Sequence, residues 1–206
     1  MSDGLVQLGF SDIVAGRPFT NPEGSAFDLT VLQYMVETVC RILKEPRAIL
    51  NQPRPVVLYL NEVGGRSHRI ALSRPEALLN CNDLTVVGFC GQRRHGVDRG
   101  PLDAVDEELI AEFPQHDELL SYSTLQLESG DSCNLVLFSQ PQGILHWASS
   151  DRHALAARMA PRYYTVIRLH TAILPGGIMA NNKLALIRTK YYDFQEEPLW
   201  QAVRDF

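Results

Sequence analysis

The sequence LTVVGFCGQ at residues 84–92 begins the segment with the clearest order of predicted elements, and DAVDEELIAEF at 103–113 and LLSYSTLQLE at 119–128 follow it. The first stretch is rich in β-branched and apolar residues and predicts a strand. The second has apolar residues at helical spacing and an acidic first turn, which favours a helix. In the third, Tyr122, Thr124 and Gln126 alternate with Ser121, Ser123 and Leu125, as residues on the two faces of a strand do.

The next elements complete a recurring order. Ser129-Gly130-Asp131 predicts a tight turn into a strand at 134–138, and 144–160 predicts a helix that Pro161 ends or kinks. TVIRLHTAIL at 165–174 predicts another strand. The order β-α-β-β-α-β is typical of the ferredoxin-like α+β fold, an antiparallel sheet with helices on one face. LALIRTKYYDF at 184–194 predicts one added strand.

The chain outside this segment has sparser signals. Residues 1–83 are interpreted as an N-terminal extension packed on the main unit, with a helix at 28–45 and a hairpin at 56–72. Asp28 is the expected N-cap of that helix. The main unit is predicted to span 84–194 and a tail 195–206. A degenerate second copy of the unit within the first half stays open.

Composition excludes several classes of protein. Of the 206 residues 45% are apolar, and 19 Lys and Arg stand against 24 Asp and Glu, for a net charge of −5. This balance argues against nucleic-acid binding, which relies on clustered cations. The longest apolar run, 56–60, is far shorter than the ~20 residues of a membrane helix. We therefore expect a cytoplasmic protein with neither a membrane nor a nucleic-acid partner.

Cysteine spacing shows no metal-binding pattern. The four cysteines are widely separated and form no C-x-x-C pair: Cys40, Cys81, Cys90 and Cys133. Two disulfides are possible, but buried free thiols are the favoured interpretation. No zinc site or other metal site is predicted.

Unusual polar residues concentrate between 134 and 170. If 146–159 is one continuous helix, His146 and His153 lie ~10 Å apart and line one elongated cavity. On the last strand of the unit Arg168 and His170 are two residues apart and share a face. They either form the polar end of a pocket or a structural salt bridge, with Asp193 or an acidic residue of a neighbouring subunit as partner.

The stretch HWASSDRH at 146–153 resembles the dimeric α+β barrel superfamily. Antibiotic-biosynthesis monooxygenases, stress-responsive barrel proteins and haem-degrading monooxygenases belong to it. Trp147, Ser149 and His153 match its loose W-x-S-x-x-x-H pattern, and the resemblance covers about 84–194. It implies a homodimer that pairs its sheets into a barrel, and a cavity between each sheet and its helices.

The resemblance departs from the family at the haem positions. Haem-degrading members have an Asn on the first strand, where this chain has Val86, Val87 and Gly88. Ala157 stands near the place of their axial His. No cofactor is therefore expected, and haem remains only an alternative.

Two kinds of function follow. The first is a non-catalytic structural or regulatory dimer. The alternative is a protein that binds a small apolar or aromatic ligand, or a cofactor-independent enzyme of monooxygenase or isomerase type. In the enzyme His153 or His170 would be the general base and Arg168 the anion stabiliser. His146, Trp147 and Tyr164 are the predicted ligand-binding residues, although a tryptophan in such a position is more often a packing anchor.

One basic run lies outside this region. Gln92-Arg93-Arg94-His95 is followed by Arg99 and then by the acidic helix. It is interpreted as a mobile loop rather than as a phosphate site. No Walker loop, G-x-S-x-G, H-E-x-x-H or G-x-G-x-x-G motif occurs.

Overall fold

The computed structural model describes residues 5–45, 49 and 52–206, and within these ranges nine strands form one sheet. The strand order across the sheet is β1-β9-β8-β7-β4-β6-β5-β3-β2. In chain order the strands are β1 (Val6–Leu8), β2 (Val56–Asn61), β3 (Ser67–Leu72), β4 (Leu84–Arg93), β5 (Leu119–Gln126), β6 (Ser132–Phe138), β7 (Tyr164–Leu174), β8 (Ala185–Asp193) and β9 (Trp200–Asp205).

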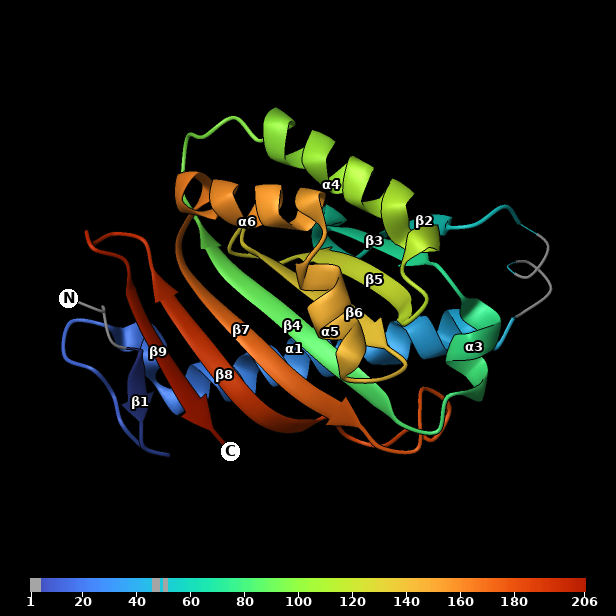
Figure 1. Cartoon of the computed structure of the whole chain (residues 1–206), viewed down its shortest axis with the longest axis horizontal. Coiled ribbons are helices and arrows are strands. Elements are labelled where there is room, and N and C mark those ends of the chain that lie inside the picture. Colours follow the sequence, from blue (N-terminus) through green and yellow to red (C-terminus); the bar gives the residue numbers. More distant parts are fainter. Residues whose placement is uncertain (1–4, 46–48, 50–51) are drawn as a thin grey trace.

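Helices cover both faces of this sheet (Figure 1). They are α1 (Pro22–Leu43), α3 (Pro75–Asn80), α4 (Gly100–Glu112), α5 (Gln142–Ala148) and α6 (Asp151–Tyr163). None of the helices in the described ranges combines the length and apolar character needed to cross a membrane. The predicted α+β class is confirmed.

The segment 84–174 forms the middle of the sheet. Its strands lie in the order β7-β4-β6-β5, and each neighbouring pair is antiparallel. Helices α4, α5 and α6 lie on one face, where Phe113 and Trp147 belong to one apolar cluster and Tyr163 and Ile167 to another. Side chains of the central strands are buried on both faces, as in β5, where five successive residues from Leu119 to Ser123 are buried.

Helix α1 lies on the opposite face and begins earlier than predicted. Asn21, not Asp28, is the N-cap, and its side chain accepts a hydrogen bond from the Glu23 N–H. Pro22 suits the first helical position, which has no hydrogen bond to lose. Asp28 therefore lies inside the helix, where its side chain is buried and faces the sheet.

Close packing holds α1 on the sheet. Leu32, Met35 and Val39 are buried in one cluster with side chains of the central strands. Gly88 on β4 permits this approach, because a Cβ there would lie 2.3 Å from Leu32 Cδ1. Since α1 covers this face of the central strands, a partner's sheet cannot pack against it. The homodimer expected through the sheet would need another surface.

The helix predicted at 144–160 is two helices. The chain breaks between α5 and α6, and the Ser150 side chain caps α6 by accepting from the His153 N–H. Pro161 does not end the helix, which continues to Tyr163. The predicted alignment of His146 and His153 along one continuous helix is wrong for this reason.

Both ends of the chain extend the sheet. The predicted hairpin is present, with β2 and β3 antiparallel and Val56 opposite Leu72. β3 pairs with β5 at one side of the central strands. The tail predicted at 195–206 contains β9, which lies between β8 and the parallel strand β1. Both flanking segments therefore contribute strands to the same sheet as residues 84–194.

Cys90 and Cys133 form a disulfide, contrary to the expectation of free thiols. They are directly opposite residues on β4 and β6, with a Cα–Cα distance of 4.3 Å. Cys40 and Cys81 are free. Spacing along the chain could not show this pairing, because strand register brings together residues that are 43 positions apart.

Thiol labelling is expected to count this bond. Alkylation of the unfolded, unreduced protein should modify two of the four cysteines, and prior reduction should expose all four. Reduction should lower the free energy of unfolding by about 2–4 kcal/mol, because the bond restricts the unfolded chain. Mass spectrometry and urea unfolding measure the two effects. Four modified cysteines without reduction would contradict the pairing.

Candidate functional site

Arg168 and His170 share a face of β7, as predicted, and both contact Asp28 of α1. Arg168 donates to both carboxylate oxygens of Asp28, at 2.5 and 2.9 Å. His170 Nε2 lies 2.9 Å from Asp28 Oδ2, and its Nδ1 lies 2.9 Å from Thr189 Oγ1. The predicted salt bridge is present, but its partner is Asp28. Asp193 pairs with Arg17 instead.

The ionised form of Asp28 is stabilised by these neighbours. Burial alone would raise the pKa of Asp28, but the hydrogen bonds from His170 and Arg168 outweigh it and hold this pKa below its usual value. His170 is buried and both of its ring nitrogens are engaged. A general base needs a free nitrogen within reach of substrate, so this geometry suits a structural ion cluster better than catalysis.

His153, Trp147 and His146 belong to the other face of the sheet. Trp147 is buried against Phe113, with ring centroids 5.5 Å apart, and His153 lies at 5.5 Å on the same indole. Burial, and then the nearby His116, lower the pKa of His153. His146 is exposed and lies 3.0 Å from Glu118. The sheet therefore separates these residues from Arg168 and His170, and the predicted common pocket is not formed.

Three possible metal ligands lie close together but do not fit a metal ion. A ligand atom of Asp28, Cys90 and His170 lies within 4.8 Å of the other two. However, the Cys90 sulfur is bonded to Cys133 and cannot coordinate as a thiolate. The Asp28 carboxylate is already engaged by the Arg168 guanidinium and by the His170 ring.

Tyr164 leads to a different site. Its ring packs edge-on against Phe89, with centroids 5.1 Å apart, and it lines a recess of about 230 Å³ at the end of β4. Burial raises the pKa of Tyr164, an effect that Arg99 and Arg93 partly offset, so its hydroxyl stays protonated and can donate. The other main contributors to this recess are the 93–99 segment and the turn 129–131.

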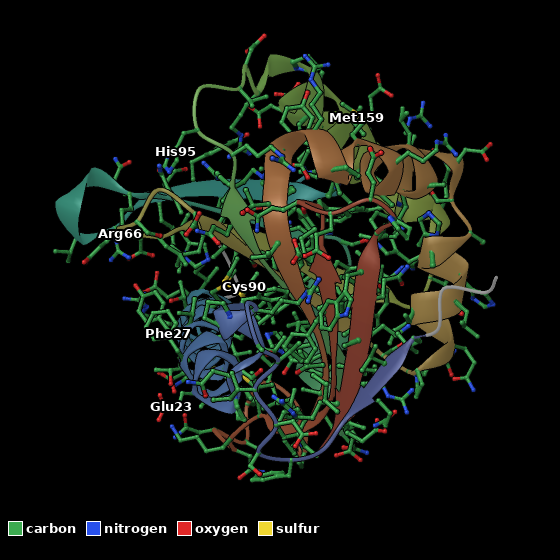
Figure 2. The ribbon with its side chains drawn as sticks, turned by 90° about the vertical axis from the view of Figure 1, so that its left-hand side faces the viewer. Glu23, Phe27, Arg66, Cys90, His95 and Met159 are labelled. Carbon is green, nitrogen blue, oxygen red and sulfur yellow. A yellow bond between two sulfur atoms is a disulfide. The ribbon has the colours of Figure 1, made fainter. Side chains whose placement is uncertain are left out.

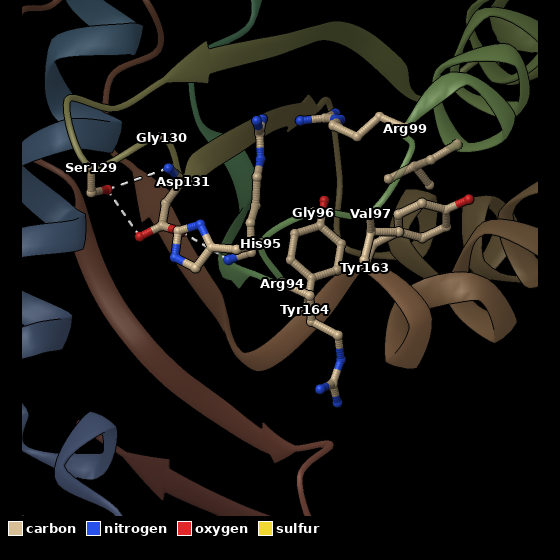
Figure 3. Close-up of a pocket in the computed structure, with 12 residues that line it drawn as sticks. Arg94, His95, Gly96, Val97, Arg99, Ser129, Gly130, Asp131, Tyr163 and Tyr164 are labelled. Atoms are coloured by element: carbon tan, nitrogen blue, oxygen red, sulfur yellow. Dashed lines mark hydrogen bonds between the residues drawn. The ribbon is translucent and has the colours of Figure 1, made fainter.

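Figure 3 shows the two sides of this basic recess. Arg99 and Tyr163 come from one side, and Ser129 and Asp131 from the other. Asp131 closes the turn by accepting from the Ser129 hydroxyl at 2.9 Å and from the Arg93 N–H at 2.8 Å. The recess is therefore held between a strand end, a helix start and a β-turn.

Positive charge in the recess is only partly compensated. Arg99 bonds Asp103 at 3.0 Å, and Arg94 donates to the carbonyls of Pro161 and Phe194. Arg93 forms no ion pair with any residue in the described ranges, and its buried Nε has no hydrogen-bond partner there. Burial, and then the Arg99 cation, lower the pKa of Arg93. An anion here would relieve this unfavourable charge.

The sequence contained a signal for this site that the loop interpretation missed. Three arginines and one histidine fall within residues 93–99, directly after a strand. The structure places Arg93 within β4 and holds Arg94 by two backbone carbonyls, so these two positions are not in a mobile loop. The residues that complete the recess are distant in sequence.

A second polar cluster joins α1 to the β2–β3 hairpin. Tyr34 donates to Glu62 at 2.5 Å, and His68 Nδ1 lies 2.8 Å from the other Glu62 oxygen. His68 is fully buried, and its Nε2 has no hydrogen-bond partner among the described residues. Burial lowers the pKa of His68 despite the nearby carboxylate.

The stability of the protein is expected to fall as pH decreases below about 6.5, the usual pKa of an unfolded histidine. The unfolded chain then binds a proton that folded His68 resists, and protonation favours unfolding until the folded pKa is reached. His153, whose pKa is also lowered, adds in the same direction. Urea unfolding at pH 7.5 and 5.5 measures the loss, which His68→Asn should reduce. An identical pH dependence in the variant would contradict the assignment.

Comparisons with known proteins add little to this geometry. No protein-family model matches the chain, and no curated protein is significantly similar in sequence. Among solved structures, the chain is similar to SnoaB, a cofactor-independent oxygenase from Streptomyces nogalater. The two share 10% sequence identity with a TM-score of 0.35, over 46% of this chain and 93% of that one. This is a weak structural resemblance.

Proposed function

We propose that this protein is a non-catalytic binding protein that holds a phosphate group in the recess lined by Arg93, Arg99 and Tyr164. One observation carries the proposal: Arg93 is a partly buried cation beside a second cation, with no ion-pair partner among the described residues. The carboxylates of Asp131 and Asp103 attract this cation but offset burial and the Arg99 charge only in part, so the pKa of Arg93 stays lowered. A partly compensated charge of this kind costs stability and is retained where a ligand needs it. The recess also contains a protonated phenol as a third donor.

Phosphate fits these groups better than a carboxylate. A phosphate monoester has a charge of about −1.5 to −2 at neutral pH and several acceptor oxygens, which match two guanidinium groups and one hydroxyl. The chain as a whole has a net charge of −5, so the recess is a local positive site on an acidic protein. This contrast favours a small anion over a polyanion.

The same placement supports a binding role over the oxygenase-like and haem-binding alternatives. The enzyme alternative assigns His153 or His170 as general base, and the haem alternative also centres on the helix that contains His153. His170 has both nitrogens engaged, and His153 packs on the Trp147 indole. We further propose that residues 84–174 form a ferredoxin-like unit, which the strand order β7-β4-β6-β5 supports.

Calorimetric titration with inorganic phosphate tests the proposal. Arg93→Gln is expected to weaken binding about 10- to 100-fold, because a charge-assisted hydrogen bond contributes about 1.5–3 kcal/mol. Lys183→Gln is the matched control, since it removes one exposed positive charge that pairs with Glu37 on α1. It should leave phosphate affinity unchanged.

A second measurement separates binding from a structural role. Without phosphate, Arg93→Gln should melt at the same temperature as the wild type or higher, because it removes an unpaired cation that Arg99 repels. A structural arginine would instead lower the melting temperature when replaced. No phosphate binding by the wild type, or equal binding by Arg93→Gln, would refute the proposed site. Acetate in place of phosphate tests whether any small anion suffices.

A further inference from the structure

A second recess lies beside the proposed phosphate site. It has a volume of about 200 Å³ and is lined on its apolar side by Phe19, Phe27, Leu127 and Val166. Ser129 and Asp131 line both recesses, so the β5–β6 turn forms the wall between them. Figure 2 views this end of the molecule and shows His95 and Phe27 above and below Cys90. The two recesses are therefore adjacent, one on each side of this turn.

Phe27 is the more exposed of the two aromatic side chains, Phe19 and Phe27, that line this second recess. Its side chain remains 60% exposed at the start of α1, although α1 buries most of its apolar residues against the sheet. Folding therefore derives little from this phenylalanine. An aromatic ring that stays exposed on the rim of a recess can stack on an aromatic ligand, which would remove apolar surface of both from water.

The polar floor of the second recess is already fixed. Arg168 and Asp28 line it, and they bond one another as described above. Arg168 keeps about a fifth of its side chain exposed, at 21%. Asp28 holds its planar guanidinium in place. The guanidinium therefore offers, besides the Phe27 ring, a flat cationic surface on which an aromatic ring can stack. Asp131, which lines both recesses, favours the charged forms of Arg93 and Arg168.

We infer that the natural ligand is an aromatic phosphate monoester, whose phosphate occupies the Arg93–Arg99 recess and whose ring occupies the recess beside Phe27. This inference rests on the proposed phosphate site. It adds the class of compound that carries the phosphate. The shared turn sets the spacing, so the ring and the phosphate must lie on opposite sides of residues 129–131.

Titration with three probes tests the inference: inorganic phosphate, phenyl phosphate and 4-phenylbutyl phosphate. The two aromatic esters cover a short and a longer spacing between ring and phosphate. At least one of them is expected to bind about tenfold or more tightly than inorganic phosphate, since burial of one aromatic ring contributes well over a factor of ten in favourable cases. Benzyl alcohol, which has a ring but no phosphate, should bind far more weakly.

Variants assign the gain to the second recess. Phe27→Ala should abolish the advantage of the aromatic esters and leave inorganic phosphate affinity unchanged. Tyr59→Ala is the matched control, because Tyr59 is 72% exposed on the edge strand β2 and lines neither recess. It should retain the full advantage. Circular dichroism confirms that both variants are folded.

The outcomes distinguish the two proposals. If phosphate binds but neither aromatic ester binds more tightly, the inference about the ring is wrong and the phosphate site stands. An advantage that survives in Phe27→Ala would also overturn it. If none of the phosphate compounds binds, the proposed function itself fails, and the inference fails with it.

Discussion

Replacement of Asp28 by alanine is expected to lower the free energy of unfolding by about 3–5 kcal/mol. The substitution removes the carboxylate that Arg168 and His170 both contact, at 2.5 and 2.9 Å. His170 is almost fully buried, so water cannot replace the partner that this ring loses. Two polar groups would remain under α1 without compensation, and the helix would lose its polar anchor on β7. Urea unfolding followed by circular dichroism measures the change.

An exposed ion pair provides the control for Asp28. Asp205→Ala removes a carboxylate that accepts from Arg188 at 2.6 Å, but both side chains are about half exposed, at 50% and 49%. Its loss should be at most about 1 kcal/mol. The double variant Asp28→Leu with Arg168→Met should recover part of the Asp28→Ala loss, because it replaces the charges by apolar groups of similar size. Equal losses for Asp28→Ala and Asp205→Ala would contradict the buried cluster.

Replacement of Trp147 by alanine is expected to cost about 3–5 kcal/mol of stability, as for other large buried aromatic residues. The indole is 6% exposed and contacts the rings of Phe113, His116 and His153 at 5.1–5.5 Å between centroids. Its removal would leave a cavity where α5, α6 and the 113–116 turn meet the sheet. Thermal and urea unfolding report the loss.

The same variant decides between the two roles considered for Trp147. In protein that remains folded, Trp147→Ala should bind inorganic phosphate as tightly as the wild type, because Trp147 does not line the basic recess. Leu145→Ala on α5 is the control, since Leu145 is 71% exposed, and its effect should stay within about 0.5 kcal/mol. A large fall in phosphate affinity with unchanged stability would show instead that Trp147 contacts the ligand.

The predicted elements between 84 and 174 agree with the structure in type and order. Hydrophobic periodicity is a local property, and each strand or helix here shows it over its own length. Boundaries were less well predicted. The break between α5 and α6 depends on the Ser150 cap, and the signal for it, a serine before an acidic residue, was present in the sequence. The alanine-rich residues at 154–160 favoured one continuous helix instead.

The predicted site residues were only partly brought together. Arg168 and His170 lie on one face because residues two apart on a strand always do. Their separation from His153 could not be predicted, because it depends on which face each helix covers. The recess that we propose as the binding site was missed since it is assembled from three segments: 93–99, 129–131 and 163–164.

The α+β class, the order of the central strands and helices, and a charge balance that disfavours a polyanion partner could all be predicted from the sequence. These properties follow from local spacing and from composition, which need no knowledge of contacts. The pairing of Asp28 with Arg168, 140 residues away, and the bond of Cys90 to Cys133 across two strands became visible only in the three-dimensional fold. The same holds for Arg93, which has no ion-pair partner among the described residues and faces a recess. Each of these depends on strand register and on the face that a helix covers, which long-range packing sets.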